Sequence, residues 1–244
     1  MIETAVILAA GLGSRLKDRT KEKPKGFLVI DQTSIIEASI QKLIKAGVNK
    51  IIIGTGYLAN FYEDLSKKYP NIICKINSRY ADTGSMYTLY NLKDLIKADF
   101  LLLESDLVYD SVGLDILIKE TKKDVILASG ETNSEDEVYI EFDKSCNLVN
   151  MSKDPKTLNS INGELVGISK VSFSTYQKMC NFSAKQFEFS PKLDYEYVFV
   201  SLAKDNDIYI KKVDDYTWCE IDNEEHLKRA KNKIYPKIKQ NEAS

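Results

Sequence analysis

The sequence predicts an α/β protein with a doubly wound, mostly parallel sheet, and two observations lead to that class. Four alternations of a buried strand with a helix fill the first half of the chain, which is typical of parallel sheets covered on both faces. Near residue 130 the pattern changes to short segments in which apolar and polar residues alternate, which indicates half-exposed antiparallel strands. We therefore expect a mixed sheet with a small antiparallel insertion.

The strands of the first half are apolar runs without polar alternation, as expected where helices cover both faces of a sheet. They are expected at residues 4–10, 50–54, 72–76, 99–104 and 124–128. The helices between them repeat apolar residues every three or four positions. These helices are expected at residues 33–46, 58–69, 85–97 and 111–120, and a short extended piece at 26–30.

The second half is expected to hold the antiparallel strands and the last helices. The strands are expected at residues 137–143, 147–151, 165–169, 208–213 and 218–221, with a loop at 154–163. Helices are expected at 172–181 and 193–204, and Asn223, followed by two glutamates, is a typical N-cap of a last helix. Residues 237–244 are polar and patternless. We expect a single domain over residues 1–236, followed by a tail or a truncated linker.

The composition excludes several classes of protein. The chain of 244 residues has a formal net charge of -2 and shows no basic stripe of the kind that binds nucleic acid. Four cysteines without a C-x-x-C pair and a single histidine argue against a zinc site and fit reduced thiols. No stretch approaches the ~20 apolar residues of a membrane helix, and the short apolar segment after Met1 contains Glu3. We therefore expect a cytoplasmic protein without membrane insertion.

The segment from the first strand to residue 28 is the strongest motif of the chain. The strand leads into Gly11-Leu12-Gly13-Ser14, Arg15 follows directly, and Lys25 comes after Pro24. Such a loop lets backbone N–H groups and two cations surround a polyphosphate. It is not a Walker loop, and Leu16 stands where the dinucleotide fingerprint needs a glycine. The alternative is an ordinary turn with surface cations.

The full string L-A-A-G-L-G-S-R at 8–15, followed by K-P-K at 23–25, resembles the signature of the sugar-1-phosphate and choline-phosphate nucleotidyltransferases. The resemblance continues in G-x-G-Y-L at 54–58, Y-A-D at 80–82 and G-S-M-Y-T-L at 84–89, so it covers nearly the whole chain. It implies a Rossmann-like fold of the nucleotide-diphospho-sugar transferase type. It also implies transfer of a nucleotidyl group from a nucleoside triphosphate to a phosphate-type acceptor, with residues 1–130 as the nucleotide-binding half and 131–222 as the acceptor-binding half.

The resemblance also implies roles for individual residues. Arg15 would bind the β- and γ-phosphates, Lys25 would stabilise the α-phosphate, and Asp106 and Asp222 would hold Mg²⁺; Lys25, Arg15 and Asp106 are thus the catalytic candidates. An ionised phosphate or phosphonate oxygen can attack without a general base, so the catalyst must supply positive charge and alignment. The candidates for nucleotide binding are Leu8, Ala10, Gly11, Gly13, Ser14, Gly56, Tyr57, Thr83, Gly84 and Ser85. Turn or helix capping by the two aspartates, and simple packing for Tyr57, are the alternatives.

CTP is the expected nucleotide because the G-x-G-Y-L segment resembles that of the small cytidylyltransferases. Two acceptors are considered, phosphocholine and 2-aminoethylphosphonate. In the choline-phosphate enzymes the position of Val138 is a tryptophan of the choline cage, although three tyrosines could rebuild one: Tyr139, Tyr195 and Tyr197. Asp194 and Glu196 instead suit a primary ammonium, which donates hydrogen bonds. We therefore favour 2-aminoethylphosphonate over phosphocholine. The acceptor-binding candidates are Ser85, Lys153, Asp194, Glu196 and Tyr139; solvated surface positions are the alternative for Lys153 and the two carboxylates.

Two further hypotheses belong to other classes. The chain could be a sugar-1-phosphate nucleotidyltransferase, or a non-catalytic nucleotide-binding module on the same fold. The module is disfavoured because such modules typically lose the cations or carboxylates that this chain keeps. The polar end of the sequence also leaves room for fusion to another enzyme of the same pathway.

Overall fold

The computed structural model describes residues 2–243. Its main sheet has nine strands. Its main path has the order β10-β6-β9-β4-β1-β2-β3, and the β7–β8 hairpin extends it beside β9. The strands are β1 Thr4–Ala9, β2 Lys50–Thr55, β3 Ile72–Ile76, β4 Phe100–Glu104, β5 Leu107–Tyr109, β6 Val125–Ser129, β7 Tyr139–Phe142, β8 Leu148–Ser152, β9 Gly163–Val171, β10 Tyr209–Val213 and β11 Trp218–Glu220. Strands β5 and β11 pair with each other in a separate small sheet.

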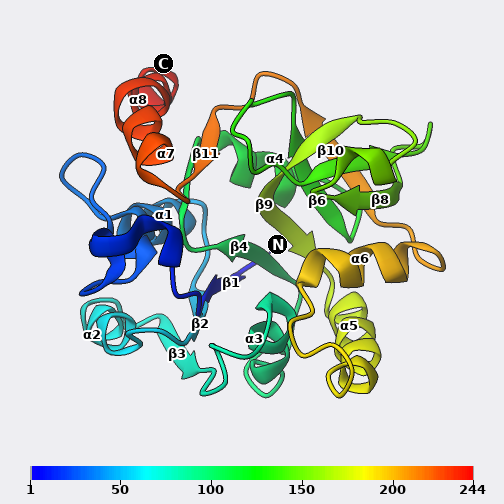
Figure 1. Cartoon of the computed structure of the whole chain (residues 1–244), viewed down its shortest axis with the longest axis horizontal. Coiled ribbons are helices and arrows are strands. Elements are labelled where there is room, and N and C mark those ends of the chain that lie inside the picture. The colour runs from blue at the N-terminus through cyan, green and yellow to red at the C-terminus, as the bar shows by residue number, and fades with distance from the viewer. Residues whose placement is uncertain (1, 244) are drawn as a thin grey trace.

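Helices connect these strands along the chain (Figure 1). They are α1 Ile35–Lys45, α2 Asn60–Lys68, α3 Ser85–Asn91, α4 Val112–Lys119, α5 Phe173–Gln186, α6 Tyr195–Ala203, α7 Glu224–Arg229 and α8 Tyr235–Ala243. Short 3₁₀ turns lie at η1 Ser14–Thr20, η2 Lys25–Phe27 and η3 Pro155–Thr157, and a π turn at η4 Ala230–Ile234. None of the helices in the described part of the chain has the length and apolarity needed to cross a bilayer.

The sheet is mixed, which confirms the predicted fold class. Strands β4, β1, β2 and β3 are parallel neighbours, as are β10 and β6, whereas β9 runs antiparallel to both β4 and β6. The segment predicted at 165–169 is therefore longer than expected and lies inside the sheet, between β6 and β4. It also pairs with β7 at one end, so the antiparallel insertion grows directly out of the central sheet.

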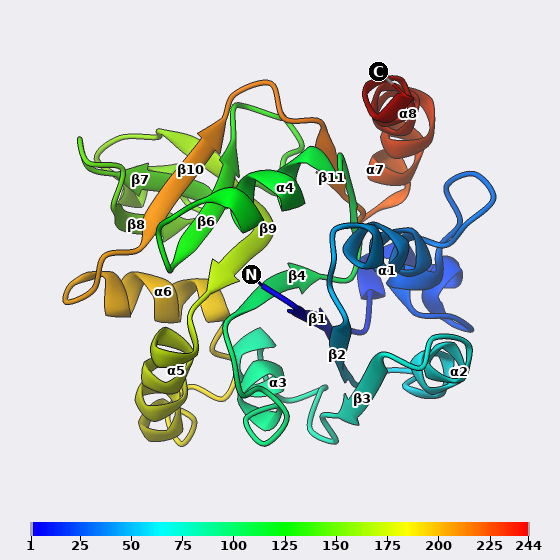
Figure 2. The same cartoon turned by 180° about the vertical axis from the view of Figure 1, so that it is seen from behind.

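Helices cover both faces of the sheet, and each face has its own core (Figures 1 and 2). On one face α1, α2 and α4 pack on the strands through buried residues such as Ile40, Tyr62 and Leu117. On the other face α3, α5 and α6 pack through residues such as Leu89 and Met179. These two cores explain why the inner parallel strands, such as β1 and β4, are apolar at most positions.

The structure corrects two predicted segments. Residues 26–30 were expected to be extended, but residues 26 and 27 belong to the 3₁₀ turn η2, closed by the Leu28 N–H that donates to the Lys25 carbonyl at 3.0 Å. The rest of the prediction is confirmed, because Leu28 is extended and Val29 forms a β-bridge with Ser34. Residues 237–244 were expected to be a patternless tail, but residues up to 243 form α8. Ile238 of α8 is 1% exposed, and the Asn241 side-chain amide donates to Asp110 at 2.8 Å. One buried residue on a polar helix leaves no periodicity that a sequence pattern can detect.

Candidate active site

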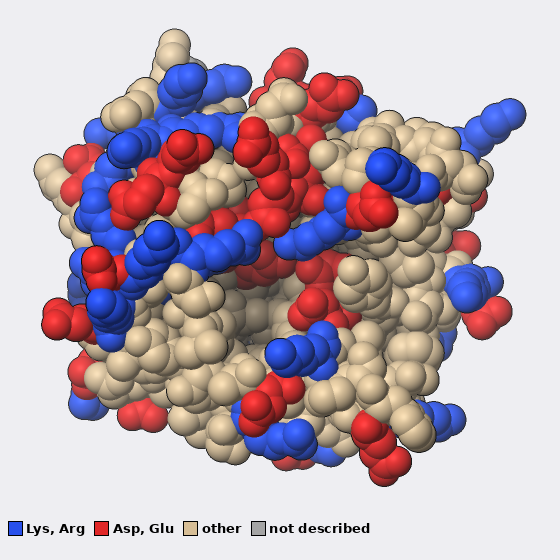
Figure 3. Space-filling view, in the orientation of Figure 1, with Lys and Arg blue, Asp and Glu red and all other residues tan. Residues whose placement is uncertain are grey.

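A cavity of about 430 Å³ opens at the carboxyl ends of β1 and β4, where ligands commonly bind in open α/β sheets. The loop after β1, the turn after β4, the start of α3, the start of α6 and the end of β11 all contribute to its lining. Figure 3 shows the hollow near the middle of one face, with Asp and Glu side chains around it and Lys and Arg side chains at its border. The strongest sequence motif therefore lies in the wall of this cavity.

The glycine loop is shaped by a left-handed residue and by one lysine. Gly13 has φ +62°, and a Cβ there would lie 3.1 Å from the side chains of both Lys25 and Thr20. The Thr20 hydroxyl donates to the Gly13 carbonyl at 2.9 Å, and the Leu16 N–H donates to the same carbonyl at 3.0 Å. Glycine is therefore needed at this position both for the backbone conformation and for the approach of Lys25.

Lys25 lies between the two aspartates that the sequence analysis assigned to a metal. Its Nζ is 2.5 Å from Asp106 Oδ2 and 2.5 Å from Asp222 Oδ1, and 3.8 Å from Glu220. Burial alone would lower the pKa of Lys25, but these carboxylates outweigh it and raise that pKa above its usual value. Burial would likewise raise the pKa of Asp222, yet hydrogen bonding and the Lys25 charge hold it below its usual range. Both groups are therefore charged near neutral pH.

Arg15 is held by carboxylates as well. It forms ion pairs with Asp136 and, at 2.7 Å, with Asp222. Lys153 donates to the second oxygen of Asp136 at 3.2 Å. Asp136 therefore joins a cation predicted to bind the nucleotide to one predicted to bind the acceptor. If Arg15 binds the triphosphate as predicted, the phosphates would replace these carboxylates as its partners.

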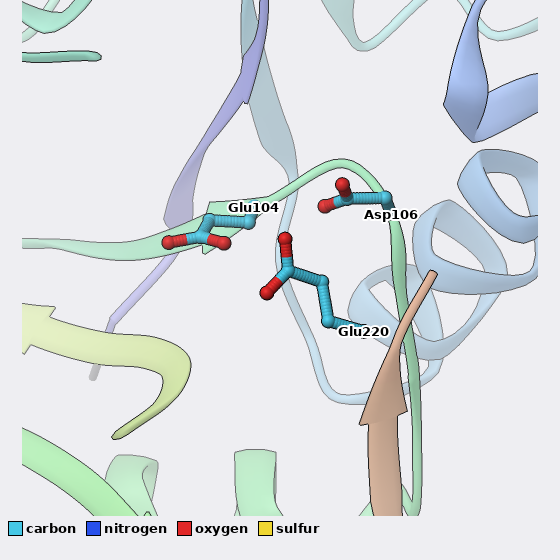
Figure 4. Close-up of side chains that lie close together, drawn as sticks. All are labelled: Glu104, Asp106 and Glu220. Atoms are coloured by element: carbon cyan, nitrogen blue, oxygen red, sulfur yellow. The ribbon is translucent and has the colours of Figure 1, made fainter. Parts of the chain in front are cut away.

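A second group of carboxylates faces the same cavity. One side-chain oxygen from each of Glu104, Asp106 and Glu220 lies within 4.8 Å of the others, and the Glu220 carboxyl group lies between those of Glu104 and Asp106 (Figure 4). Burial, followed by repulsion from neighbouring carboxylates, raises the pKa of Glu104 to about 8 and that of Glu220 well above its usual value. Repulsion of this kind is relieved when a cation binds.

The donor set fits a hard divalent cation. Carboxylate oxygens are the ligands that Mg²⁺ prefers, and the cluster offers several within reach of one centre. Asp222 Oδ2 is buried and has no hydrogen-bond partner within residues 2–243, so it too keeps a free lone pair. Asp106 belongs to both the predicted pair and the observed cluster, whereas Asp222 lies beside the cluster and shares Lys25 with Asp106 as an ion-pair partner.

The start of α3 is built on a buried asparagine. Asn77 is 1% exposed, and its amide donates to the hydroxyls of Thr83 at 3.0 Å and Thr88 at 3.1 Å. This network fixes Thr83 at the cavity wall. Ser85 is engaged elsewhere: its N–H and its hydroxyl both donate to Asp194 Oδ1 at 3.0 Å. Two predicted acceptor ligands are therefore paired with each other.

The first turn of α6 supplies the remaining wall. The Tyr195 hydroxyl donates to Glu104 at 2.6 Å. Glu196 Oε2 is buried and finds no hydrogen-bond partner among the described residues. Burial, reinforced by Asp194, raises the pKa of Glu196 to about 7. Val138 lines the cavity as well, so the position compared with a cage tryptophan does face this site.

Most of the predicted site residues line this cavity, and four do not. Those that line it are Leu8, Ala10, Gly11, Gly13, Arg15, Lys25, Thr83, Gly84, Ser85, Asp106, Lys153, Asp194, Glu196 and Asp222. Ser14, Gly56, Tyr57 and Tyr139 are not among the lining residues. The Tyr57 hydroxyl donates to the Lys21 carbonyl at 3.0 Å and thus holds the loop after η1, while the Tyr139 hydroxyl donates to Glu137.

Several residues that line the cavity were not predicted from the sequence. Glu104 and Glu220 each stand two positions before a predicted aspartate, at the last residues of β4 and β11, so their closeness in sequence to these aspartates was a usable signal. Asp136 carried no signal. The same holds for His226, whose Nδ1 accepts from the Asp222 N–H at 3.3 Å and whose Nε2 contacts the Ser134 carbonyl at 2.9 Å.

This sheet, loop and set of charges define a nucleotidyltransferase, and the family comparison agrees: the model described as Nucleotidyl transferase matches residues 4–185. The chain belongs to this family.

Among curated relatives, the choline-phosphate cytidylyltransferase of Streptococcus pneumoniae is 28% identical over 223 residues, 90% of this chain and 93% of the relative. A CTP:phosphoglutamine cytidylyltransferase of Campylobacter jejuni is 32% identical over 178 residues, 68% of this chain and 65% of the relative. A 2-aminoethylphosphonate cytidylyltransferase of Lancefieldella rimae is 35% identical over 106 residues, 43% of either chain.

Solved structures agree on the fold. The CTP:phosphocholine cytidylyltransferase from Streptococcus pneumoniae superimposes with a TM-score of 0.79 at 24% identity, covering 94% of this chain and 98% of that one. The inositol-1-phosphate CTP transferase from T. maritima gives a TM-score of 0.82 at 17% identity over 98% and 97%.

Proposed function

We propose that the protein is a Mg²⁺-dependent cytidylyltransferase that joins CMP from CTP to 2-aminoethylphosphonate and releases pyrophosphate. The curated relatives described above, all cytidylyltransferases by name, support CTP as the nucleotide. The acceptor rests mainly on one observation, the buried carboxylate oxygen of Glu196 that lacks a hydrogen-bond partner in residues 2–243. A primary ammonium supplies the donors that this oxygen lacks.

The aromatic residues of the cavity support the same choice. Of the three tyrosines considered for a choline cage, Tyr195 lines the cavity, and its hydroxyl is used by Glu104. Tyr139 and Tyr197 are not among the lining residues, and Tyr197 is 51% exposed. A quaternary ammonium depends on aromatic faces because it cannot donate a hydrogen bond. Phosphocholine is nevertheless the second candidate, because the choline-phosphate relative aligns with 90% of the chain.

The proposed reaction needs charge and alignment more than proton transfer. An ionised oxygen of the phosphonate attacks the α-phosphorus of CTP, the bond to the bridging oxygen breaks, and pyrophosphate carries away the electron pair. In this proposal Lys25 binds the α-phosphate and Arg15 the leaving phosphates, each exchanging carboxylate partners for phosphate oxygens. Asp106 and Asp222, with Glu220 beside them, would hold Mg²⁺. When bound, Mg²⁺ supplies positive charge that offsets the negative oxygens of the triphosphate.

The two halves of the chain divide this work in the proposal. Residues 1–130 supply the glycine loop, Lys25 and Asp106, and residues 131–222 supply Lys153 and Glu196. Asp222, at the end of the second half, forms an ion pair with Lys25 of the first half. The reacting groups therefore meet at the border between the halves.

An acceptor panel tests the proposed function. Pyrophosphate release is measured with CTP and Mg²⁺ and, in turn, 2-aminoethylphosphonate, phosphoethanolamine and phosphocholine. We expect the highest kcat/KM for 2-aminoethylphosphonate, and no release after chelation of the metal. A clear preference for phosphocholine would refute the acceptor assignment, and nucleotide binding without turnover of any acceptor would refute the enzymatic one.

Replacement of Lys25 tests its role at the α-phosphate. Lys25→Met is expected to lower kcat by about 10²–10³-fold, since removal of one preorganised donor to the transition state has that effect in other enzymes. Lys42→Met is the matched control. The Lys25 and Lys42 side chains are 16% and 19% exposed and both form ion pairs, but Lys42 lies outside the cavity. Near-normal kcat in Lys25→Met would contradict the role.

A further inference from the structure

Helices α3 and α6 meet at their N-termini, although 109 residues separate Ser85 from Asp194. The Gly84 N–H donates to the Pro191 carbonyl at 3.0 Å, and the Met86 N–H donates to the Leu193 carbonyl at 3.2 Å. A Cβ at Gly84 would lie 2.4 Å from the Leu193 carbonyl oxygen. The two backbones are therefore in direct contact, and glycine is needed there for that approach.

Two side chains at this junction cap each other's helix. Asp194 Oδ1 accepts from both the N–H and the hydroxyl of Ser85, at 3.0 Å each. The Ser85 hydroxyl oxygen in turn accepts from the Tyr195 N–H, the first residue of α6, at 3.0 Å. Each side chain therefore satisfies a backbone N–H that the other helix would leave without a partner at its start.

The residues that follow this junction reach the acceptor end of the cavity. Tyr195 donates to Glu104, and Glu196 presents its unpartnered oxygen, both from the first turn of α6. Their positions depend on where that turn begins. The N–H and the hydroxyl of Ser85 both donate to Asp194, so neither is available to a phosphonate oxygen.

We propose that Ser85 and Asp194 form a positioning pair, which sets the first turn of α6 against α3 and thereby places Tyr195 and Glu196 for the acceptor. The pair does not bind the acceptor directly. This inference relies on the proposed function only for the statement that an acceptor binds beside Glu196.

A carboxamide replacement separates positioning from direct binding. Asn keeps the oxygen that accepts from Ser85 but loses the charge that would attract an ammonium. With CTP saturating, we expect Asp194→Ala to raise the acceptor KM by about tenfold or more, and Asp194→Asn by no more than about threefold. The KM for CTP is expected to change by less than about twofold in both. Equal losses in Asp194→Ala and Asp194→Asn would overturn the proposal.

The pairing itself is tested by a double-mutant cycle. Because the two side chains act as a unit, Ser85→Ala combined with Asp194→Ala should raise the acceptor KM no further than the worse single variant. Multiplication of the two single effects would contradict the pairing. Ser34→Ala is the matched control, since the Ser34 hydroxyl caps α1 by accepting from the Glu37 N–H, and Ser34 does not line the cavity. It is expected to lower thermal stability without raising the acceptor KM.

The two proposals fail in distinguishable ways. The wild-type panel identifies the preferred acceptor, and the variants are then compared with that acceptor, whichever it is. A preference for phosphocholine therefore refutes the proposed acceptor while the ratio of Asp194→Ala to Asp194→Asn still decides the positioning role.

Discussion

At the scale of single residues, the charge of Glu196 is costly in the free protein and would be stabilised by a bound cation. One carboxylate oxygen of Glu196 is buried without a hydrogen-bond partner among residues 2–243, which makes the charged form costly. Burial, together with the nearby charge of Asp194, raises the pKa of Glu196 to about 7. A cation that binds beside it removes this cost. If the proposed acceptor binds here, Glu196 lowers the stability of the free protein and favours binding of the positively charged ligand, as strained functional sites commonly do.

Glu196→Gln is expected to stabilise the free protein at alkaline pH. The folded-state pKa of about 7 lies above the ordinary value of 4.5, so between these pH values the folded state binds more protons than the unfolded state. Wild-type stability therefore falls as the pH rises through this window, while Glu196→Gln escapes this loss. We expect the variant to gain about 1–3 kcal/mol in free energy of unfolding at pH 8.5, by urea unfolding, and to raise the acceptor KM.

The comparison near pH 4.5 serves as the internal control, because there the two proteins should differ little. Glu188→Gln changes an exposed glutamate between α5 and α6 and should leave the pH profile unchanged. A Glu196→Gln variant that is no more stable than wild type at pH 8.5 would contradict this account of the buried charge.

At the scale of elements, α8 packs against the segments that follow the glycine loop. Ile238 packs in a cluster that includes Leu16 of η1 and Leu28 after η2, so the helix and the loop share a small core. Glu242 adds an ion pair with Lys42 at 2.9 Å. The C-terminal helix therefore packs against the segment that follows the glycine loop, although α8 does not line the cavity.

Ile238→Ala is expected to lower the free energy of unfolding by about 2–5 kcal/mol, because a buried isoleucine leaves a cavity when it is truncated. It should also weaken CTP binding, measured by titration calorimetry, since Leu16 loses a packing partner. Ile44→Ala, at an exposed isoleucine on α1, is the control and should cost much less. An Ile238→Ala variant as stable as that control would show that α8 is not needed for folding.

At the scale of the whole molecule, what the sequence could predict follows from how local each signal is. The parallel strands are apolar because both faces are covered, so they are visible in short windows such as Lys50–Thr55. The position of β9 between β6 and β4 cannot be predicted from such windows, because strand order depends on contacts between distant segments. The same limit applies to the site: Gly13 and Lys25 belong to a motif, whereas Asp136 meets Arg15 across 121 residues of sequence.

The excess of acidic side chains around the cavity affects which ligands can enter it. Among the side chains that line it within residues 2–243, eight carry carboxylates and four carry Lys or Arg groups. Even with Glu104 and Glu220 protonated, as their raised pKa values favour, the acidic groups outnumber the basic ones. The free cavity thus has a negative electrostatic potential, which repels a bare triphosphate and attracts cations. In the proposed reaction the nucleotide would then enter together with its counterions, and an acceptor with a positive end would be admitted more readily than a purely anionic sugar phosphate.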